Sequence, residues 1–158
     1  MPPISAILHT LNDGLRLGRA LETLRPCDEL LVIDHGSTDQ TLRIAREYAA
    51  TIRTASQSAV DPLQWARHDW LFCLLPSESL SEALEATLFE WTLKDAREVI
   101  EVPAASLGVR EETERGWSQA QRATRLIPRT WSLWAGQLPA FDARAAMLQG
   151  DLLRFALP

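Results

Sequence analysis

Three short stretches of the chain hold polar residues of the types that bind ligands or transfer protons. They are His9-Thr10-Leu11-Asn12, Asp34-His35-Gly36-Ser37 and Pro76-Ser77-Glu78. Imidazole and carboxylate groups act as general bases, and hydroxyl and amide groups orient a substrate by hydrogen bonding. Each stretch directly follows an apolar run, so its chemistry depends on where the fold places those runs.

The apolar runs predict a sheet of buried strands. The runs at 4–8, 30–33 and 70–75 are too short for helices, and no charged residue interrupts them. Strands of this kind are buried on both faces, which is typical of a parallel sheet covered by helices. Shorter strands are expected at 51–54 and 99–102.

Helices are expected between these strands. Apolar spacing predicts a helix over 15–24, with Asn12 or Asp13 as its cap and Pro26 after its end. The next helix is expected to start at Thr38 or Asp39.

The segment 55–69 is polar, and we expect only a brief helix over 62–67. Ser79 and Glu82 have the spacing of a capping box, which predicts a long helix ending near Arg97. Beyond Pro103 the periodicity weakens, and irregular strands and loops are expected.

The three polar stretches are expected to meet in one pocket. In open parallel sheets, ligands bind beyond the carboxyl ends of the strands, where the strand order reverses. The pattern therefore predicts a pocket with two histidines, His9 and His35, the carboxylate of Asp34 and several hydroxyl groups.

Composition indicates a single globular domain over 1–158. Hydrophobic residues make up 46% of the chain and charged residues 23%. The net charge of −5 argues against a general nucleic-acid-binding protein. The two cysteines have no zinc-site spacing, no apolar run is long enough to cross a bilayer, and the N-terminus lacks a basic leader. A cytoplasmic protein without a transmembrane segment is expected.

Several segments resemble glycosyltransferase family 2 of the GT-A fold. ISAILHTLND matches the first strand and its loop in that family, VIDHGSTDQT matches its V-V-D-D-G-S-T-D-G-T motif, and HDWLFCLLPSE matches its D-x-D segment. RLIPR at 125–129, WAGQLP at 134–139 and GDLLRF at 150–155 are similar to later motifs of the short bacterial lipopolysaccharide-core type. The resemblance implies a GT-A-like three-layer α/β/α fold with a mainly parallel, Rossmann-like sheet. It also divides the domain into a nucleotide-binding-type half, 1–103, and an irregular acceptor-type half, 104–158.

The family transfers a sugar from a nucleotide-diphosphate sugar to an acceptor, here a cell-envelope glycan, so these are the partners that the resemblance implies. It places the protein in the cytoplasm, free or peripheral to the inner membrane. The nucleotide-binding residues that it implies are His9, Thr10, Leu11, Asn12, Asp34, His35, Gly36 and Ser37. The residues that it implies for the diphosphate or donor are Glu78, Arg122 and Arg125. It assigns no catalytic residue.

The chain departs from the family at the positions that carry chemistry. His35 replaces the second acid of the D-D pair, Leu75-Pro76-Ser77 replaces the D-x-D triplet, and Leu138-Pro139 replaces the H-E pair. Arg154 replaces a late histidine. Leucine and proline side chains cannot bind Mg²⁺ or Mn²⁺ as carboxylates do. The expectation is therefore no metal cofactor, and a site that is either metal-independent or inactive.

Each candidate also has a structural interpretation. Asp34 is either a ribose ligand or a turn acid that accepts from the Gly36 and Ser37 amides. His9 and His35 could stack on a base or bind a metal ion, and Glu78 could be catalytic or simply begin a helix.

The arginines of 115–129 either grip a diphosphate or form a solvated basic face. Trp117, Trp131 and Trp134 either line an acceptor groove or anchor a loop-rich tail. Two further functions stay open. One is a non-catalytic module that binds a nucleotide, glycan or protein, and the other is a different nucleotide-dependent transfer with His9 or His35 as base.

Overall fold

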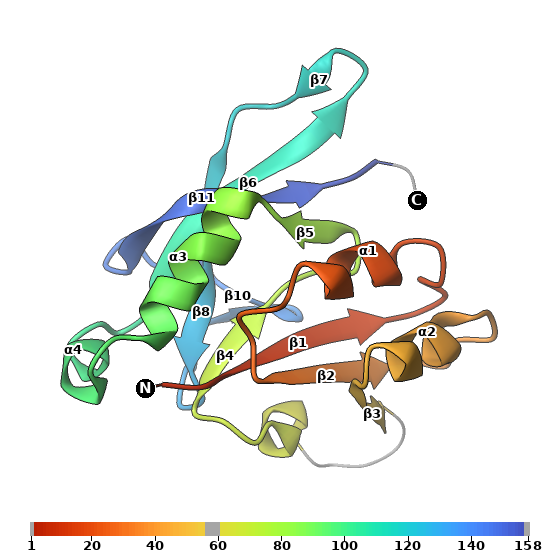
Figure 1. Cartoon of the computed structure of the whole chain (residues 1–158), viewed down its shortest axis with the longest axis horizontal. Helices are drawn as coiled ribbons and strands as arrows, with labels where there is room; N and C mark the ends of the chain where they lie inside the picture. The colour runs from red at the N-terminus through yellow and green to blue at the C-terminus, as the bar shows by residue number, and fades with distance from the viewer. Residues whose placement is uncertain (1, 56–60, 157–158) are drawn as a thin grey trace.

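The central element is a mixed, curled β-sheet. The computed structural model describes residues 2–55 and 61–156. Within them the strand order is β3-β2-β1-β4-β8-β6-β11-β5, with β7 paired to β6 (Figure 1). The strands are β1 Ile4–Thr10, β2 Glu29–Asp34, β3 Thr51–Thr54, β4 Trp70–Cys73, β5 Glu78–Leu80, β6 Ala105–Thr113, β7 Gly116–Trp117, β8 Gln121–Pro128 and β11 Ala146–Arg154. A separate hairpin joins β9 Trp134–Ala135 and β10 Leu138–Pro139. The helices are α1 Leu17–Glu22, α2 Thr41–Glu47, η1 Pro62–Trp65 (a 3₁₀ turn), α3 Glu82–Thr92 and α4 Ala96–Ile100.

The first half of the sheet is parallel, as the apolar runs predict. β1 lies between β2 and β4, and all three run in the same direction, with β3 parallel beyond β2. The register pairs His9 with Ile33 and Thr10 with Asp34. The residues that follow β1 and β2 therefore leave the sheet side by side at the same edge.

The second half of the sheet is more regular than expected. β8 pairs antiparallel with both β4 and β6, and β11 runs parallel to β6. Irregular strands and loops were expected here, because the apolar periodicity is weak. The structure shows the cause: β8 starts exposed at Gln121 and becomes buried from Thr124 to Ile127, so no single pattern covers its length.

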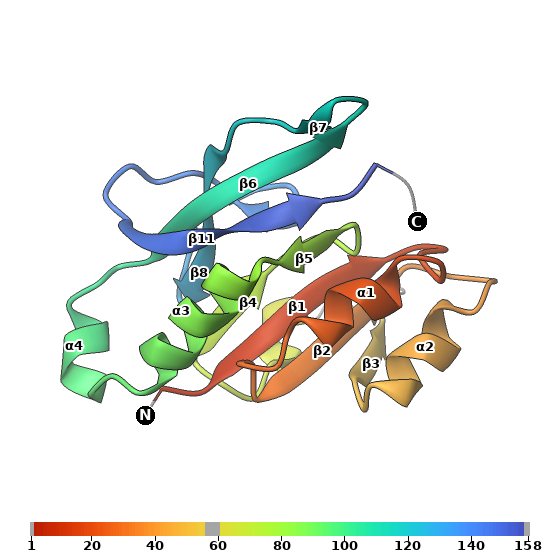
Figure 2. The same ribbon diagram turned by 45° about the horizontal axis from the view of Figure 1, so that its top comes forward.

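Helices cover one face of the sheet, and aromatic loops cover the other. α1, α2 and α3 lie on one face (Figure 2), over a core that includes Leu8, Phe72 and Leu84. On the other face η1, Trp131, Trp134 and Leu138 pack over a second core of buried β-strand residues. That core includes Ile7, Leu31, Ile33, Leu71 and Ile127. The predicted fold class, α/β of GT-A type, is confirmed.

Two predicted helix starts are wrong by a few residues. α1 begins after Arg16, with no side-chain cap, because the Asp13 carboxylate instead accepts from the Leu11 amide and from Arg16. α2 begins at Thr41 rather than at 38 or 39, and the Asp39 carboxylate accepts from the Thr41 amide.

The predicted capping box at Ser79 is also wrong. Residues 78–80 form β5, which pairs antiparallel with β11, and the cap of α3 is Ser81, whose hydroxyl accepts from the Leu84 amide. The helix ends at Thr92, and Asp95 caps a separate helix, α4, where the sequence analysis expected a strand over 99–102.

The strand over 51–54 and the brief helix near 62–67 are confirmed, although residues 56–60 of the polar segment lie outside the described residues. Among the described residues, no helix has the length and apolar character needed to cross a membrane.

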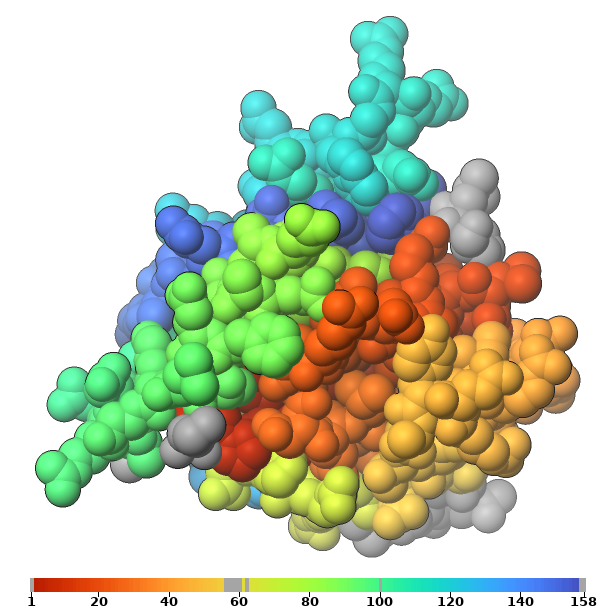
Figure 3. All heavy atoms as spheres, in the orientation of Figure 1, coloured from red at the N-terminus to blue at the C-terminus, as the bar shows by residue number. Residues whose placement is uncertain are grey.

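The hairpin of β6 and β7 projects from the body of the molecule, as the space-filling view in Figure 3 shows.

Candidate functional site

A cleft lies at the carboxyl ends of β1, β2 and β4, where the sequence analysis places the pocket. It consists of two adjoining hollows that share His9 and Gln137. The first hollow, of about 410 Å³, is lined by residues from the ends of these strands and from the loops after them. They are His9, Thr10, Leu11, Asp13, Arg16, His35, Leu75, Pro76, Ser77 and Gln137.

The second hollow, of about 500 Å³, lies toward η1 and the β9–β10 hairpin. Its lining includes Asp61, Leu63, Thr130, Trp131 and Trp134, together with His9 and Gln137.

His9 and His35 form a hydrogen-bonded pair at the junction of the two hollows. His9 Nδ1 lies 2.9 Å from His35 Nε2, and the ring centroids are 5.1 Å apart. The parallel register causes this contact, because the His35 amide continues the ladder by donating to the Thr10 carbonyl at 2.8 Å. Burial, and secondarily the nearby His35, lower the pKa of His9 to about 4. His9 is therefore neutral at pH 7, and one ring of the pair donates to the other.

Asp34 is a turn acid rather than a cleft residue. It is 3% exposed, and its carboxylate accepts from the Thr10 hydroxyl at 2.7 Å, the Ser37 hydroxyl at 2.5 Å, and the amides of Gly36 and Ser37. Burial raises the pKa of Asp34, but the hydrogen bonds from Ser37, Thr10 and Gly36 outweigh it and lower that pKa below its ordinary value. Both oxygens of the Asp34 carboxylate therefore accept hydrogen bonds from Thr10 and from the turn after β2.

The other residues that match the family motif tie the loop after β1 to the loop after β2. Asn12 Oδ1 accepts from the Thr38 amide at 2.8 Å, and the Asn12 amide donates to Ser37 Oγ at 2.9 Å. A second link joins the Gly14 amide to Asp39 at 2.9 Å.

The loops after β1 and β2 are thus held together by a set of motif residues that line neither hollow. These residues are Asn12, Asp34, Gly36 and Ser37. His9, Thr10, Leu11 and His35 are the predicted nucleotide-binding residues that the structure brings to the cleft.

Glu78 is fully buried in an ion-pair network. Arg125 donates to its two oxygens at 2.7 and 3.0 Å, Arg154 donates at 2.9 Å, and the Leu75 amide donates at 2.7 Å. Burial raises the pKa of Glu78, but the bonds and charge of Arg125, followed by Leu75 and Arg154, lower it overall. The Glu78 carboxylate is thus hydrogen-bonded within the protein, and Glu78 is absent from the lining of both hollows of the cleft.

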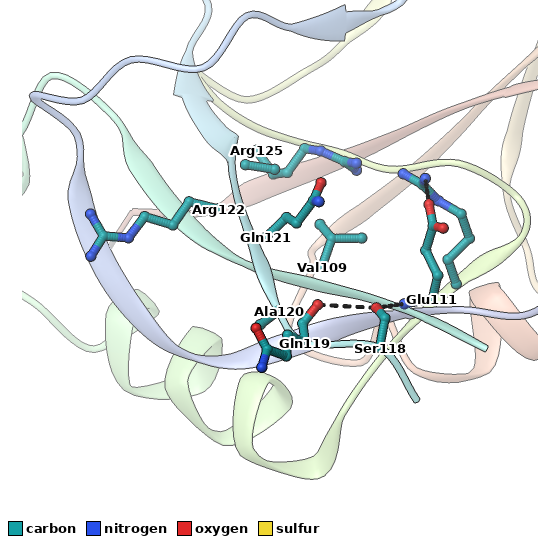
Figure 4. Close-up of a pocket in the computed structure, with 10 residues that line it drawn as sticks. Val109, Glu111, Ser118, Gln119, Ala120, Gln121, Arg122 and Arg125 are labelled. Carbon is teal, nitrogen blue, oxygen red and sulfur yellow. Dashed lines mark hydrogen bonds and ion pairs between the residues drawn. The ribbon is translucent and has the colours of Figure 1, made fainter. Parts of the chain in front are cut away.

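The two arginines expected at the diphosphate lie outside the lining of the cleft. Arg125 is buried against Glu78 and the Cys73 carbonyl, whereas Arg122 is exposed on β8. Residues three apart on a strand point to opposite faces, and Figure 4 shows the two side chains pointing in different directions. Both line a separate hollow of about 370 Å³, which also includes Glu111, Gln121 and Arg154.

Sequence reasoning did not identify Gln137 and Arg16 as cleft residues. Gln137 stands beside Gly136, which has φ +68° at the turn between β9 and β10, and its amide nitrogen lies 3.4 Å from His35 Nε2. Gly136 was the available signal of a tight turn, but the position of that turn depends on long-range packing. Arg16 is fixed to Asp13 at 2.6 Å, and its side chain is 41% exposed at the rim of the first hollow.

The position of the D-x-D motif does not fit a hard divalent cation. Its residues here, Leu75, Pro76 and Ser77, offer one hydroxyl and no carboxylate, and the Ser77 carbonyl accepts from the Phe155 amide at 2.9 Å. The next acid, Glu78, is occupied by Arg125 and Arg154. Within residues 2–55 and 61–156, no group of three or more histidine, cysteine or acidic side chains is arranged to hold a metal ion.

Comparison with known proteins finds glycosyltransferases that are similar to part of this chain. The chain is 39% identical over 46 residues to the lipopolysaccharide core biosynthesis glycosyltransferase LpsC of Rhizobium meliloti, which is 29% of this chain and 17% of LpsC. It is 30% identical over 93 residues to an uncharacterized glycosyltransferase of Rickettsia felis, which is 54% of this chain and 32% of that protein. The chain thus spans less than a third of the length of both relatives. No family model matches it.

Solved structures with the same fold include S. aureus TarS and a mycobacterial protein. TarS superposes with a TM-score of 0.57 at 19% identity, over 74% of this chain and 23% of TarS. The mycobacterial protein gives a TM-score of 0.52 at 20% identity, over 72% of this chain and 43% of that chain. At these identities the likeness concerns the fold.

Proposed function

From this GT-A fold and the sequence similarity to glycosyltransferases, we propose that the chain binds a nucleotide-diphosphate sugar in the first hollow of the cleft. The observation that carries the proposal is the position of that hollow, at the carboxyl ends of β1, β2 and β4, where parallel sheets bind ligands. The similarity to LpsC, a lipopolysaccharide core biosynthesis glycosyltransferase, suggests a cell-envelope glycan as the acceptor. The same proposal places the protein in the cytoplasm, free or peripheral to the inner membrane.

The proposal includes binding without a divalent cation, since the D-x-D carboxylates are replaced by Leu75, Pro76 and Ser77. Arg16 is the cation that lines the first hollow, and a guanidinium can pair with phosphate oxygens. The hydrogen-bonded His9–His35 pair and the Gln137 amide supply further donors and acceptors beside it. These residues take the place of the family's acidic ligands.

A non-catalytic binding module is the second candidate, and the ion pairs of Glu78 favour it. The carboxylate nearest in sequence to the D-x-D position is held by Arg125 and Arg154, so it is not free to take a proton from an acceptor. The fold and the cleft would then serve to bind a nucleotide, a glycan or a partner protein.

Calorimetry with UDP, GDP and CDP, first with Mn²⁺ and then with EDTA, tests nucleotide binding. We expect heat with at least one nucleotide, unchanged by EDTA. Arg16→Ala should weaken binding, because it removes the rim cation, whereas Arg122→Ala, on the far hollow, should leave it unchanged. The absence of heat with every nucleotide would refute the proposal. Binding that requires Mn²⁺ would show that a metal site exists outside the D-x-D position.

Release of the nucleotide diphosphate from the corresponding sugar donors, in EDTA and with extracted core glycan present, then separates the two candidates. Turnover supports a metal-independent transferase. Binding without turnover supports the non-catalytic module.

A further inference from the structure

The second hollow of the cleft has an aromatic wall, formed by Trp131 and Trp134, whose two indole N–H groups donate to backbone carbonyls. Trp131 Nε1 donates to the Leu133 carbonyl at 2.7 Å, and Trp134 Nε1 donates to the Trp131 carbonyl at 3.1 Å. Both side chains are half-buried and line the hollow. Because their polar edges already have partners, these indoles offer the hollow only their carbon surfaces.

Polar groups surround this aromatic wall. Asp61 contributes a carboxylate, of which Oδ1 accepts from the Leu63 amide, and Thr130, Gln137 and His9 contribute a hydroxyl, an amide and an imidazole. Together they supply both donors and acceptors. Gly136 leaves the space beside Gln137 open, since a Cβ there would meet no atom within 4 Å.

The charges of the second hollow disfavour an anionic ligand. Arg129 is the guanidinium in its lining, and its terminal nitrogens already donate to the carbonyls of Leu63, Ala66 and His68. Asp61 adds a negative charge that would repel phosphate. The ligand that fits is uncharged, has an apolar face for the indoles and carries several hydroxyl groups at its edge.

We infer that the second hollow is a saccharide-binding subsite, in which a sugar ring packs its C–H face on Trp131 and Trp134 and hydrogen-bonds to Asp61 and Gln137. The two hollows share His9 and Gln137, so a saccharide here lies directly beside the nucleotide hollow. Its assignment as the acceptor position rests on the proposed function, whereas saccharide binding itself does not.

The test is an NMR titration of the six indole N–H resonances with methyl glycosides of glucose, galactose, mannose and N-acetylglucosamine. Single Trp→Phe variants assign the resonances. We expect at least one glycoside to shift those of Trp131 and Trp134 and to leave that of Trp117 in place, because Trp117 packs edge-on against Phe155, outside the lining of the cleft.

Variants then locate the bound sugar. Gln137→Ala and Trp131→Leu should each weaken glycoside binding by about five- to tenfold, the range for losing one hydrogen bond or one aromatic contact. Trp117→Leu is the matched control and should have no effect. Gln137 is exposed, so its replacement keeps the test valid if Trp131→Leu lowers stability.

Failure of this inference is distinguishable from failure of the proposed function. If a nucleotide binds but no glycoside shifts Trp131 or Trp134, or if both variants bind glycosides as the wild type does, the subsite is refuted and the nucleotide proposal stands. If glycosides bind but no nucleotide does, the subsite stands and the nucleotide proposal falls.

Discussion

Arg125 on β8 and Glu78 on β5 join two strands that are far apart in the order of the sheet. Their side chains are 4% and 0% exposed, and two hydrogen bonds of 2.7 and 3.0 Å connect them. In the sheet order β6 and β11 lie between β8 and β5, so the pair spans the inside of the curl. Arg125 also donates to the Cys73 carbonyl on β4. Arg125 therefore links β8 to both β5 and the end of β4.

Replacement of Glu78 by Gln should destabilise the protein strongly. It leaves the Arg125 charge buried without a counter-ion, which typically costs about 3–5 kcal/mol in the free energy of unfolding. Urea denaturation at pH 7 measures this loss. Arg122→Ala, an exposed arginine on the same strand, is the control and should change the free energy by less than about 0.5 kcal/mol.

The pH dependence of the same variant provides a second measurement. Because the pKa of Glu78 is lowered in the folded state, its contribution is present above its unfolded pKa of 4.5 and is lost as the pH falls through the folded value. The wild type should lose stability more steeply than Glu78→Gln below pH 4.5. Equal slopes, or equal stability at pH 7, would mean that the ion pair is dispensable.

Two serines near the start of α3 should respond in opposite ways to replacement by alanine. Ser81 Oγ accepts from the Leu84 amide at 3.2 Å and from the Asp151 amide at 3.0 Å, so Ser81→Ala should cost about 1–2 kcal/mol in unfolding free energy. Ser79 Oγ is buried without a hydrogen-bond partner among the described residues, so Ser79→Ala should be neutral or stabilising. Thermal unfolding of both variants checks this. A larger loss for Ser79→Ala would support the capping box expected from the sequence.

That capping box shows why local sequence was a sufficient guide to the parallel half of the fold and a poor one near β5. Buried strands such as β1 and β2 produce apolar runs that no other element of that length explains. At 78–80, in contrast, the Ser79–Glu82 spacing satisfies a local rule, but pairing with β11 and the attraction of Arg125 for Glu78 outweigh it. Those partners lie about fifty to seventy residues away in the chain, as the bonds of Glu78 and Ser81 show.

The residues of the cleft also differ in whether the sequence alone could place them. His9 and His35 could be placed together from the parallel register alone, because each follows an adjacent strand. Gln137 could not, since its hairpin reaches the cleft only through packing of the second core. The different directions of the Arg122 and Arg125 side chains could be predicted only if residues 121–128 were known to form a strand. The weak apolar periodicity of the tail did not reveal that strand.

The close approach of Gly150 to α3 should make that glycine much less replaceable than Gly136. Both have positive φ, +102° and +68°. A Cβ at Gly150 would lie 2.3 Å from the Leu84 amide nitrogen and 2.6 Å from the Leu84 Cα, whereas one at Gly136 would meet nothing within 4 Å.

Gly136→Ala should cost about 1–2 kcal/mol, the strain of the left-handed conformation alone. Gly150→Ala should cost several kcal/mol, because backbone must move as well. Denaturation curves of the two variants give the difference, and equal losses would contradict the contact with α3.

The pKa of His9 should lie far below the ordinary value of a histidine. Burial first, and His35 second, lower its pKa from 6.5 to about 4, so NMR titration of the His9 ring should give a midpoint near pH 4. His35→Ala should raise that midpoint but leave it below 6.5, since burial is the larger cause. Between these two pH values the unfolded chain binds a proton that the folded His9 does not, so stability should fall as the pH decreases from 6.5 to 4. His9→Gln, which retains a hydrogen-bonding group, should remove that component of the decline. A His9 midpoint near 6.5 in the wild type would contradict the burial of its ring, and would mean that the two rings are hydrated and separate in solution.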